Sequence, residues 1–388
     1  MKERIGLILT GGGARAAYQV GVLKAIAELL PRRAHNPFPV ICGTSAGALN
    51  AATLAINAQS FRKGVRYLNN IWKNFHANQI YRTDAVGVFN NTMLWLAGLI
   101  LSGLGINRIK QVSLLDNSPL SNLLDQVLPC EKIQQSIDAG LLRALSITAS
   151  GYASGHSVTF YQGTDDIAPW RRTRRIGIPT KIENKHLLAS SALPFIFPAT
   201  LINREYFGDG SMRQIAPISS ALHLGATRIL VIGSTTDALE HDRHPEASEY
   251  PSLAQIAGHA LNSIFLDSME VDLERVQTVN KLVAMMPEDV RQRVGLTHLE
   301  LLVISPSESL DKIAESHAAN LPWTIRLLLR LVGAAQKNGG ATLTSFLLSE
   351  KKYCSTLIDL GYRDAMQRRD EISRFFSPPR ASDQGMPQ

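Results

Sequence analysis

The chain has 388 residues, of which 45% are hydrophobic and 19% are charged, a composition typical of a folded globular protein that excludes a largely disordered one. Forty lysine and arginine residues against 33 acidic residues give a formal net charge of +7, which favours an anionic partner. Because the sequence has no recognisable nucleic-acid motif, we expect a phospholipid surface and no nucleic acid. Three widely spaced cysteines suit neither a disulfide framework nor a zinc site and indicate a reducing compartment.

The first sixty residues alternate apolar strands with helices. Residues 4–10 form an apolar run that ends in three glycines, and residues 14–30 carry apolar side chains at helical spacing. Residues 38–42 predict a second buried strand, residues 43–47 a tight turn and residues 48–58 a second helix. Strand, loop and helix repeated in this order predict a parallel sheet.

Later apolar runs extend the same pattern. Residues 145–149, 229–232 and 299–304 predict further strands, and residues 253–284 predict a helical stretch. The expected fold class is therefore α/β: a three-layer α/β/α sandwich with a mainly parallel central sheet. Length alone permits one large domain or two.

The turn at residues 43–47 has the G-x-S-x-G pattern of a nucleophile elbow. It reads Gly43-Thr44-Ser45-Ala46-Gly47. In such a turn a strand passes sharply into a helix and holds the serine hydroxyl at the apex, where bulky neighbours would clash. Five small residues can also make a simple tight connection, but the predicted strand before them and helix after them favour the elbow, with Ser45 as the nucleophile.

A glycine-rich loop ends the first predicted strand. It reads Gly11-Gly12-Gly13-Ala14-Arg15. Backbone N–H groups of such a loop, helped by the Ala46 N–H, can bind a developing oxyanion. With Ala16 in the last position the loop also satisfies the G-x-G-x-x-G/A pattern of a dinucleotide site, which requires an acid at the end of the second strand. Here that strand runs into the elbow instead, so the sequence favours an oxyanion hole over nucleotide binding.

Two later segments complete a set of four blocks. They are residues 189–198, Ala-Ser-Ser-Ala-Leu-Pro-Phe-Ile-Phe-Pro, and residues 207–211, Phe-Gly-Asp-Gly-Ser. In this order the four blocks, which together span most of residues 5–218, resemble those of the bacterial patatin-like phospholipase family. In that family the glycine-rich loop and its arginine form the oxyanion hole, the elbow serine attacks, and an aspartate of an Asp-Gly-Gly or Asp-Gly-Ala triplet is the only base.

The resemblance implies a role for each matching residue. It assigns Ser45 to nucleophilic attack and Asp209 to proton transfer. The residues it assigns to the oxyanion hole are Gly11, Gly12, Gly13 and Arg15. The triplet here reads Asp209-Gly210-Ser211, so its third residue carries a hydroxyl where the family has a smaller side chain.

The implied function is that of a serine carboxylic-ester hydrolase acting on lipid acyl esters, of the phospholipase A or lysophospholipase type, without metal or cofactor. Phospholipid, lysophospholipid, glyceride and acyl thioester stay open as acyl donors. One alternative is an α/β-hydrolase with a Ser-Asp-His triad, in which His298 or His317 is the base. Another is a non-catalytic lipid-binding protein. The polar group His241, Asp242 and His244 lacks any supporting context for a metal site.

We expect one hydrolase domain over residues 1–376, with the catalytic blocks within residues 5–218 and a helical extension over about residues 252–376. Residues 377–388 read as a disordered tail. The N-terminal apolar run, residues 5–9, is too short for a signal sequence. A cytoplasmic protein is therefore expected, at most peripheral to the inner face of a membrane, and its oligomeric state stays open.

Three segments bear on contact with lipid. The uncharged stretch between Asp84 and Arg108 is too interrupted by asparagine and glycine for a span of about 20 apolar residues. Its part around residues 93–106 either borders the acyl-binding channel or lipid-facing mouth, or is a buried core helix. Residues 321–337 form an amphipathic segment that packs against the domain or lies on a membrane. The basic residues 171–175 are our first candidate for binding anionic lipid.

Overall fold

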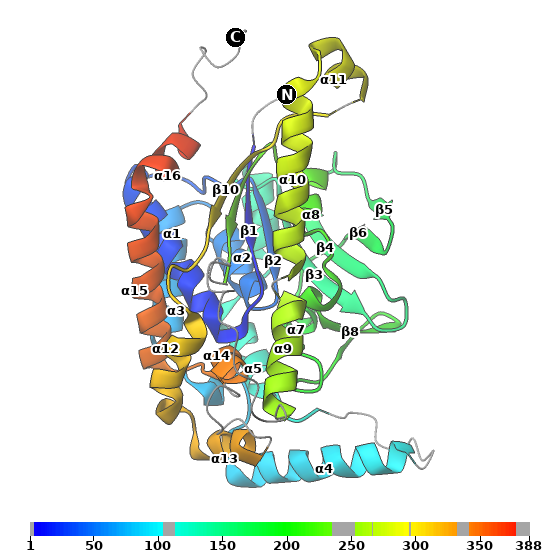
Figure 1. The fold of residues 1–388 in the computed structure, drawn as a ribbon, viewed down its shortest axis with the longest axis vertical. Helices are drawn as coiled ribbons and strands as arrows, with labels where there is room; N and C mark the ends of the chain where they lie inside the picture. The colour runs from blue at the N-terminus through cyan, green and yellow to red at the C-terminus, as the bar shows by residue number, and fades with distance from the viewer. Residues whose placement is uncertain are drawn as a thin grey trace, which may run out of the picture.

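The computed structural model describes residues 4–103, 113–234, 253–265, 267–294, 296–331 and 341–377. These residues form one ten-stranded sheet with helices on both of its faces (Figure 1). The strand order is β10-β9-β1-β2-β3-β4-β6-β5, and β8 pairs with β3 and β7 beside this path. The strands are β1 (Ile5–Leu9), β2 (Val40–Thr44), β3 (Ala144–Gly151), β4 (Ser157–Gly163), β5 (Trp170–Arg172), β6 (Arg175–Pro179), β7 (Thr200–Ile202), β8 (Glu205–Asp209), β9 (Arg228–Ile232) and β10 (Glu300–Ile304).

The central part of the sheet is parallel. Strands β10, β9, β1, β2 and β3 all run in the same direction. Beyond β3 the sheet becomes mixed, because β4 and β8 both pair antiparallel with β3. The carboxyl ends of the parallel strands therefore meet at one edge, where ligands of open α/β sheets bind.

Alternating side chains of the central strands enter two separate cores. Leu7 and Leu9 of β1 lie in the larger core, and Ile8 between them lies in the smaller one. In β9 the pattern repeats, with Leu230 in the larger core and Val231 in the smaller. Both faces of the sheet are thus covered, which confirms the predicted three-layer α/β/α arrangement with a mainly parallel sheet.

Helices α1, α2, α3 and α15 cover one face of the sheet, and α8 and α10 cover the other (Figure 1). The helices near the glycine loop and the elbow are η1 (Gly13–Ala16), α1 (Ala17–Leu29), α2 (Ala46–Ile56), α3 (Phe61–Lys73), η2 (Ala77–Gln79) and α4 (Ala85–Gly103). The middle of the chain adds α5 (Ser118–Val127), α6 (Lys132–Asp138), α7 (Asn184–Ser190), η3 (Gly210–Arg213), α8 (Pro217–His223), α9 (Leu253–Phe265), α10 (Asp267–Met285) and α11 (Glu288–Val294). The last are α12 (Leu310–His317), η5 (Ala318–Asn320), α13 (Trp323–Leu331), α14 (Ala341–Leu347), α15 (Lys351–Gln367) and α16 (Arg369–Phe376).

The C-terminal region is built into the sheet and its covering helices. Strand β10 extends the parallel sheet beside β9, as the apolar run at residues 299–304 predicts. Helix α15 packs along α1, where the hydroxyl of Tyr18 donates a hydrogen bond to Oδ2 of Asp364 over 3.0 Å. Both side chains are buried.

The predicted strands at residues 4–10, 145–149 and 229–232 are confirmed, but the second strand lies further along the chain than expected. Pro39 has no N–H for a ladder hydrogen bond, so β2 begins at Val40 and continues through Gly43 and Thr44, which we had placed in the turn. Helix α2 accordingly begins at Ala46, immediately after Ser45. The helical stretch at residues 253–284 is confirmed in α9 and α10.

Several expectations fall on residues that the structure does not describe. The polar group His241, Asp242 and His244 lies outside the described residues, as do residues 378–388 of the tail expected over residues 377–388. So do residues 104–107 of the uncharged stretch and residues 332–337 of the amphipathic segment. The remaining parts of these two segments form α4 and α13.

Candidate active site

Ser45 occupies the apex between β2 and α2. Its backbone has φ 55° and ψ −130°, a conformation that an L-residue rarely adopts and that is typical of a nucleophile elbow. The elbow also requires Gly47, because a Cβ there would run into the carbonyl oxygens of Leu9 and Thr10 at the end of β1. The small residues predicted for the turn therefore let α2 approach the neighbouring strand closely.

The glycine loop lies beside this elbow because of the sheet register. Leu9 pairs with Gly43, so the segments that follow β1 and β2 leave the sheet side by side. Gly13 has φ 56°, and a Cβ on it would meet the Phe346 carbonyl of α14. Only glycine fits this position without strain. The hydroxyl of Ser234, just after β9, donates to the carbonyl oxygen of Gly11 and fixes the loop from the other side.

Asp209 reaches the elbow through two further strand pairings. Thr44 pairs with Thr148 of β3, and Ala149 of the same strand pairs with Asp209 at the end of β8. The Asp209 side chain is fully buried, and its Oδ1 accepts a hydrogen bond from the Ser211 N–H over 2.9 Å. The register thus brings the predicted nucleophile and the predicted base to one edge of the sheet.

The free oxygen of Asp209 is the chemically important one. Oδ2 is buried and accepts no hydrogen bond of ordinary geometry from the described residues, yet the Ser45 hydroxyl lies near enough to influence the carboxyl group. Burial raises the pKa of Asp209 to about 6, and the hydrogen-bonding influence of Ser45 and Ser211 opposes that rise. A carboxylate with a pKa in this range can take up a proton near neutral pH.

Ser190 links the elbow to strand β3 by two hydrogen bonds. The N–H of Ser45 donates to Oγ of Ser190 over 2.8 Å, and the Ser190 hydroxyl donates in turn to the Thr148 carbonyl over 2.6 Å. Ser190 is fully buried at the end of α7. The sequence placed it within a family block but gave it no role, and only the contact across the chain identifies it as a positioning residue.

An apolar cavity opens beside Ser45. Its polar lining includes Ser45, Ser191 and Ser349. Its other lining residues come from the glycine loop, the elbow, α2, α3, α5, α14 and nearby loops: Gly13, Ala14, Ala46, Leu49, Trp72, Phe75, Ile80, Tyr81, Leu120, Leu193, Phe197, Phe346 and Leu347. A second apolar cavity between α2, α3 and α5 shares Leu49, Trp72, Phe75 and Leu120 with the first. The two cavities therefore lie next to each other.

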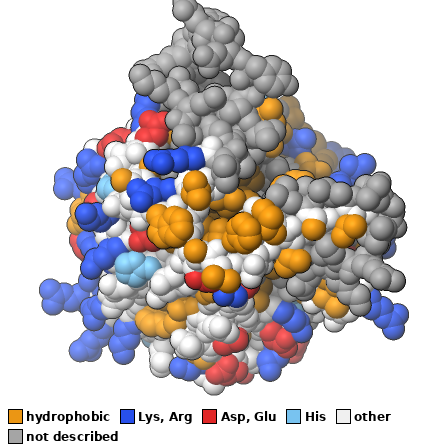
Figure 2. Space-filling model, turned by 90° about the horizontal axis from the view of Figure 1, so that it is seen from below, with side chains coloured by type: hydrophobic (Ala, Val, Ile, Leu, Met, Phe, Trp, Pro, Cys, Tyr) orange, Lys and Arg blue, Asp and Glu red, His pale blue; other side chains and the backbone are white. Residues whose placement is uncertain are grey.

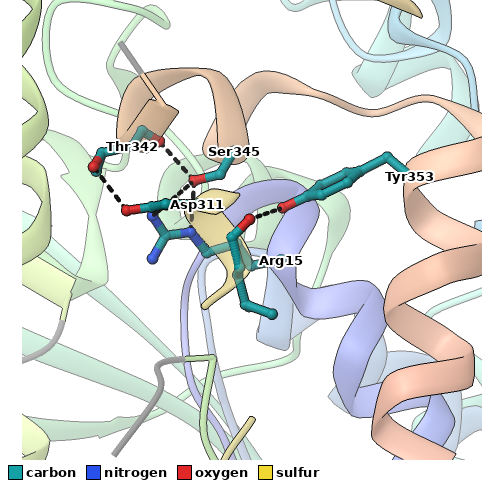
Figure 3. Close-up of polar contacts among 6 residues, drawn as sticks. Arg15, Asp311, Thr342, Ser345 and Tyr353 are labelled. Atoms are coloured by element: carbon teal, nitrogen blue, oxygen red, sulfur yellow. Dashed lines mark hydrogen bonds and ion pairs between the residues drawn. The ribbon is translucent and has the colours of Figure 1, made fainter. Parts of the chain in front are cut away.

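Arg15 is not among the residues that line this cavity, and its side chain enters a polar cluster with α12 and α14 (Figure 3). Its Nη2 lies 2.6 Å from Oδ1 of Asp311, and its Nε donates to Oγ of Ser345 over 2.8 Å. The guanidinium also lies over the Phe346 ring, 4.1 Å from the ring centroid. Thr342 donates to the other oxygen of Asp311, so the cluster joins the glycine loop to the C-terminal helices.

A family model provides the deciding comparison. The model described as patatin-like phospholipase matches residues 7–222, more than half of the chain, and includes the elbow, the glycine loop and Asp209. The chain belongs to the patatin-like phospholipase family. Membership supports a lipid acyl hydrolase, because members of this family act on lipid esters.

Two individual proteins also match this patatin-like chain. A lysophospholipase, nte1 of Aspergillus terreus, is 50% identical over 54 residues, which make up 14% of this chain and 3% of that protein. The chain thus matches only a small part of that relative. The crystal structure of VipD from Legionella pneumophila aligns with a TM-score of 0.39 at 12% identity, covering 95% of this chain and 67% of that one.

The two histidines considered for a triad lie elsewhere in this patatin-like fold. His298 is exposed just before β10, at the amino end of the parallel strands, whereas Ser45 follows the carboxyl end of β2. His317 ends α12, where its ring nitrogens contact Asn320 and Thr356. Within the described ranges no histidine hydrogen-bonds to Ser45 or Asp209.

The described residues hold neither a cluster of metal ligands nor a helix that could span a membrane. No three His, Cys, Asp or Glu side chains there come together as metal ligands, and residues 241–244 lie outside that part of the chain. None of the helices described combines the length and the apolar character that crossing a bilayer requires.

Proposed function

We propose that this patatin-like protein is a serine lipid acyl hydrolase of the phospholipase A or lysophospholipase type, in which Ser45 is the nucleophile and Asp209 the only base. The observation that carries the proposal is the pairing of a strained, buried Ser45 with a buried Asp209 whose pKa is raised to about 6. The apolar cavity beside Ser45 supports a lipid acyl chain as the group transferred.

The proposed reaction has two halves. The Ser45 hydroxyl gives its proton to Oδ2 of Asp209 as Oγ attacks the ester carbonyl, and a tetrahedral oxyanion forms. Its collapse breaks the bond to the alcohol, which takes the proton from Asp209 as it leaves. Water then attacks the acyl-enzyme with Asp209 again as the base, and the fatty acid is released with Ser45 restored.

We propose that backbone amides bind the oxyanion. Of the five residues predicted for this role, Gly13 and Ala46 line the cavity beside Ser45, while Gly11 and Gly12 continue the same loop. The backbone N–H groups at the start of α2 and of η1 also carry the positive end of a helix dipole. The contacts of Arg15 with Asp311 and Ser345 favour a part in fixing the loop rather than in touching the oxyanion.

Release of fatty acid from a diacyl phospholipid, a lysophospholipid, a glyceride and an acyl thioester would test the proposal and choose among the donors. Ser45→Ala and Asp209→Asn should each lose at least about 10³-fold in kcat. The double variant should be little worse than either single one, because two groups that act as a unit are not additive. Ser219→Ala, on α8 across the sheet, is a matched control that should keep its activity.

The rival functions predict different results. A collapse of turnover in His298→Ala or His317→Ala, with the fold intact, would favour a Ser-Asp-His triad. Binding of lipid by the wild type without hydrolysis of any of the four donors would favour a non-catalytic lipid-binding protein.

A further inference from the structure

Helices α4 and α13 expose large apolar side chains on the surface of the described chain. On α4 the exposed residues recur at helical spacing, and the side chains of Val86 and Phe89 are 69% and 63% exposed. On α13 Trp323 is 61% exposed and Leu327, one turn later, is 50% exposed. Met93 and Leu94 continue the exposed row on α4.

The two helices form one surface although they are more than 200 residues apart in the chain. The Thr324 hydroxyl of α13 donates to the Thr83 carbonyl, just before α4, over 2.8 Å. Figure 1 draws α4 and α13 together at the lower end of the molecule, and Figure 2 shows apolar side chains gathered on that end. We name this surface the apolar end and define it by Val86, Phe89, Met93, Leu94, Trp323 and Leu327.

The apolar end adjoins the cavity beside Ser45. Tyr81 lines that cavity four residues before α4 begins, and its hydroxyl donates to the Leu347 carbonyl over 2.9 Å. Phe195 lies between Leu193 and Phe197, which both line the cavity. It is 77% exposed and has a φ of 66°, an unfavourable backbone for an aromatic L-residue. An exposed aromatic held at this cost beside a lipid site indicates contact with an apolar partner.

The charges around the apolar end suit an anionic surface. The described residues of the two helices and their flanks, 85–103 and 318–331, contain no Asp or Glu. Arg326 and Arg330 are exposed on α13 itself. The nearest acid before α4, Asp84, is neutralised by Arg82 in an ion pair of 3.0 Å. Exposed Trp and Phe combined with cations and no acids are typical of helices at the interface of an anionic bilayer.

We propose that the apolar end docks on an anionic lipid bilayer and sets the cavity mouth against it, an inference that rests on the proposed lipid substrate. The basic residues 171–175, our first candidate from the sequence, lie on β5, β6 and the turn between them, at the edge of the sheet and apart from α4 and α13 (Figure 1). Docking through the apolar end would leave that patch off the bilayer.

Vesicle binding by an inactive protein tests docking without relying on hydrolysis. All variants carry Ser45→Ala, and binding to vesicles of phosphatidylcholine with phosphatidylglycerol is measured by co-sedimentation. Phe89→Ser with Trp323→Ser should weaken partitioning at least about 30-fold, because two large apolar side chains no longer enter the interface. The matched control is Leu282→Ser with Met285→Ser, two exposed apolar residues of α10, which should change it less than twofold.

A second pair of variants separates the two basic surfaces. Arg326→Glu with Arg330→Glu should weaken binding to anionic vesicles by about fivefold or more for each arginine, since each contributes roughly 1 kcal/mol near such a surface. It should have little effect on vesicles of phosphatidylcholine alone. Arg171→Glu with Arg172→Glu should have little effect on either. The reverse order of effects would overturn the proposal in favour of the β5–β6 edge.

Two other outcomes would also overturn it. Equal losses in the α10 control and in the apolar-end variant would mean that binding is not confined to this surface. A wild-type dimer that Phe89→Ser with Trp323→Ser dissociates, with vesicle binding unchanged, would make the surface a contact between copies of the chain. In the Ser45-containing protein, turnover of a soluble short-chain ester checks the proposed function separately, because none of these substituted residues lines the cavity.

Discussion

In the described chain no basic side chain forms a hydrogen bond or an ion pair with Asp209. Burial is therefore the main cause of its raised pKa. Its pKa is about 6 in place of 3.8, and the proposed mechanism needs the ionised form. We therefore expect kcat/KM for a soluble ester to fall about tenfold per pH unit below pH 6 and to level off above it. A pH series from 4.5 to 8, with circular dichroism to follow folding, measures this profile. An acid limb centred near pH 4 would contradict the raised pKa.

The same buried carboxyl group lowers the stability of the fold above pH 6. Between pH 3.8 and 6 the unfolded chain gives up the Asp209 proton while the folded chain keeps it, so its contribution to stability falls as the pH rises through this window. A shift of about 2 pKa units corresponds to roughly 3 kcal/mol. Asp209→Asn should therefore be more stable than wild type at pH 8, by up to about 3 kcal/mol, and nearly equal to it at pH 4. Denaturant unfolding at the two pH values measures the difference, and equal stability at pH 8 would argue against a buried charge.

At the scale of elements, the Arg15 cluster joins the glycine loop to α12 and α14. Arg15 is buried but Asp311 is 27% exposed, so we expect the loss of either partner to cost less than the roughly 3–5 kcal/mol typical of a fully buried ion pair. If Arg15 acts through Asp311, then Arg15→Ala and Asp311→Ala should lose similar stability and similar kcat, and the double variant should be no worse than either single one. Thermal unfolding and ester turnover of the two single variants and the double variant, each compared with wild type, give this double-mutant cycle.

The oxyanion role that the family resemblance gives to Arg15 predicts a different pattern. Arg15→Ala would then lose about 10²–10³-fold in kcat, while Asp311→Ala would keep most of the turnover. Arg15→Lys distinguishes the two further, since lysine retains the charge but cannot reproduce the paired contacts with Asp311 and Ser345.

Trp72 of α3 lines both apolar cavities. Its ring stacks on Phe75 at 5.0 Å, and its indole N–H donates to Oδ1 of the buried Asn50 over 2.8 Å, so its position is fixed. Trp72→Leu should join the cavities and shift the preference toward longer acyl chains, by about fourfold for each additional methylene that becomes buried. KM values for esters of increasing chain length measure the shift. Leu68→Ala enlarges only the second cavity and should leave the preference unchanged.

The sequence predicted those elements whose structure depends on contacts between residues that are near one another in the chain. Gly47 and the other small residues of the elbow are required by contacts within two adjoining strand-and-helix units, so a short pattern reveals them. The start of β2 was misplaced because the apolar pattern outweighed Pro39, which cannot join a ladder.

Contacts between distant parts of the chain leave no such pattern. The partners of Arg15 lie about 300 residues further along, and a serine such as Ser190 has the same local signature whether it supports the elbow or faces solvent. Likewise the basic residues 171–175 stand out in the sequence by density alone, whereas the apolar end is assembled from two separate helices. The sequence predicted each segment separately as a possible contact with lipid, but it did not predict that the two helices form one surface.

At the scale of the whole molecule, we propose that residues 1–376 fold as a single unit, as expected from the sequence. Strand β10 joins the parallel sheet, and α15 covers α1, so the C-terminal region shares the core with the catalytic blocks. We expect one unfolding transition, with coincident midpoints by tryptophan fluorescence and by far-ultraviolet circular dichroism. Two separate transitions would instead indicate that the C-terminal region is an independent domain.

Helix α14 lies late in the chain and forms part of the cavity lining, so the cavity is completed only late in the synthesis of the protein. Phe346 and Leu347 close the space beside Ser45, and the Phe346 carbonyl lies against Gly13. The ribosome makes the nucleophile and its base long before these residues, because a chain emerges N-terminus first. We expect a nascent chain that already displays Ser45 and Asp209 to lack a closed acyl site until Phe346 and Leu347 have also been translated. A potential lipase would then leave cellular lipids untouched while it is still being made.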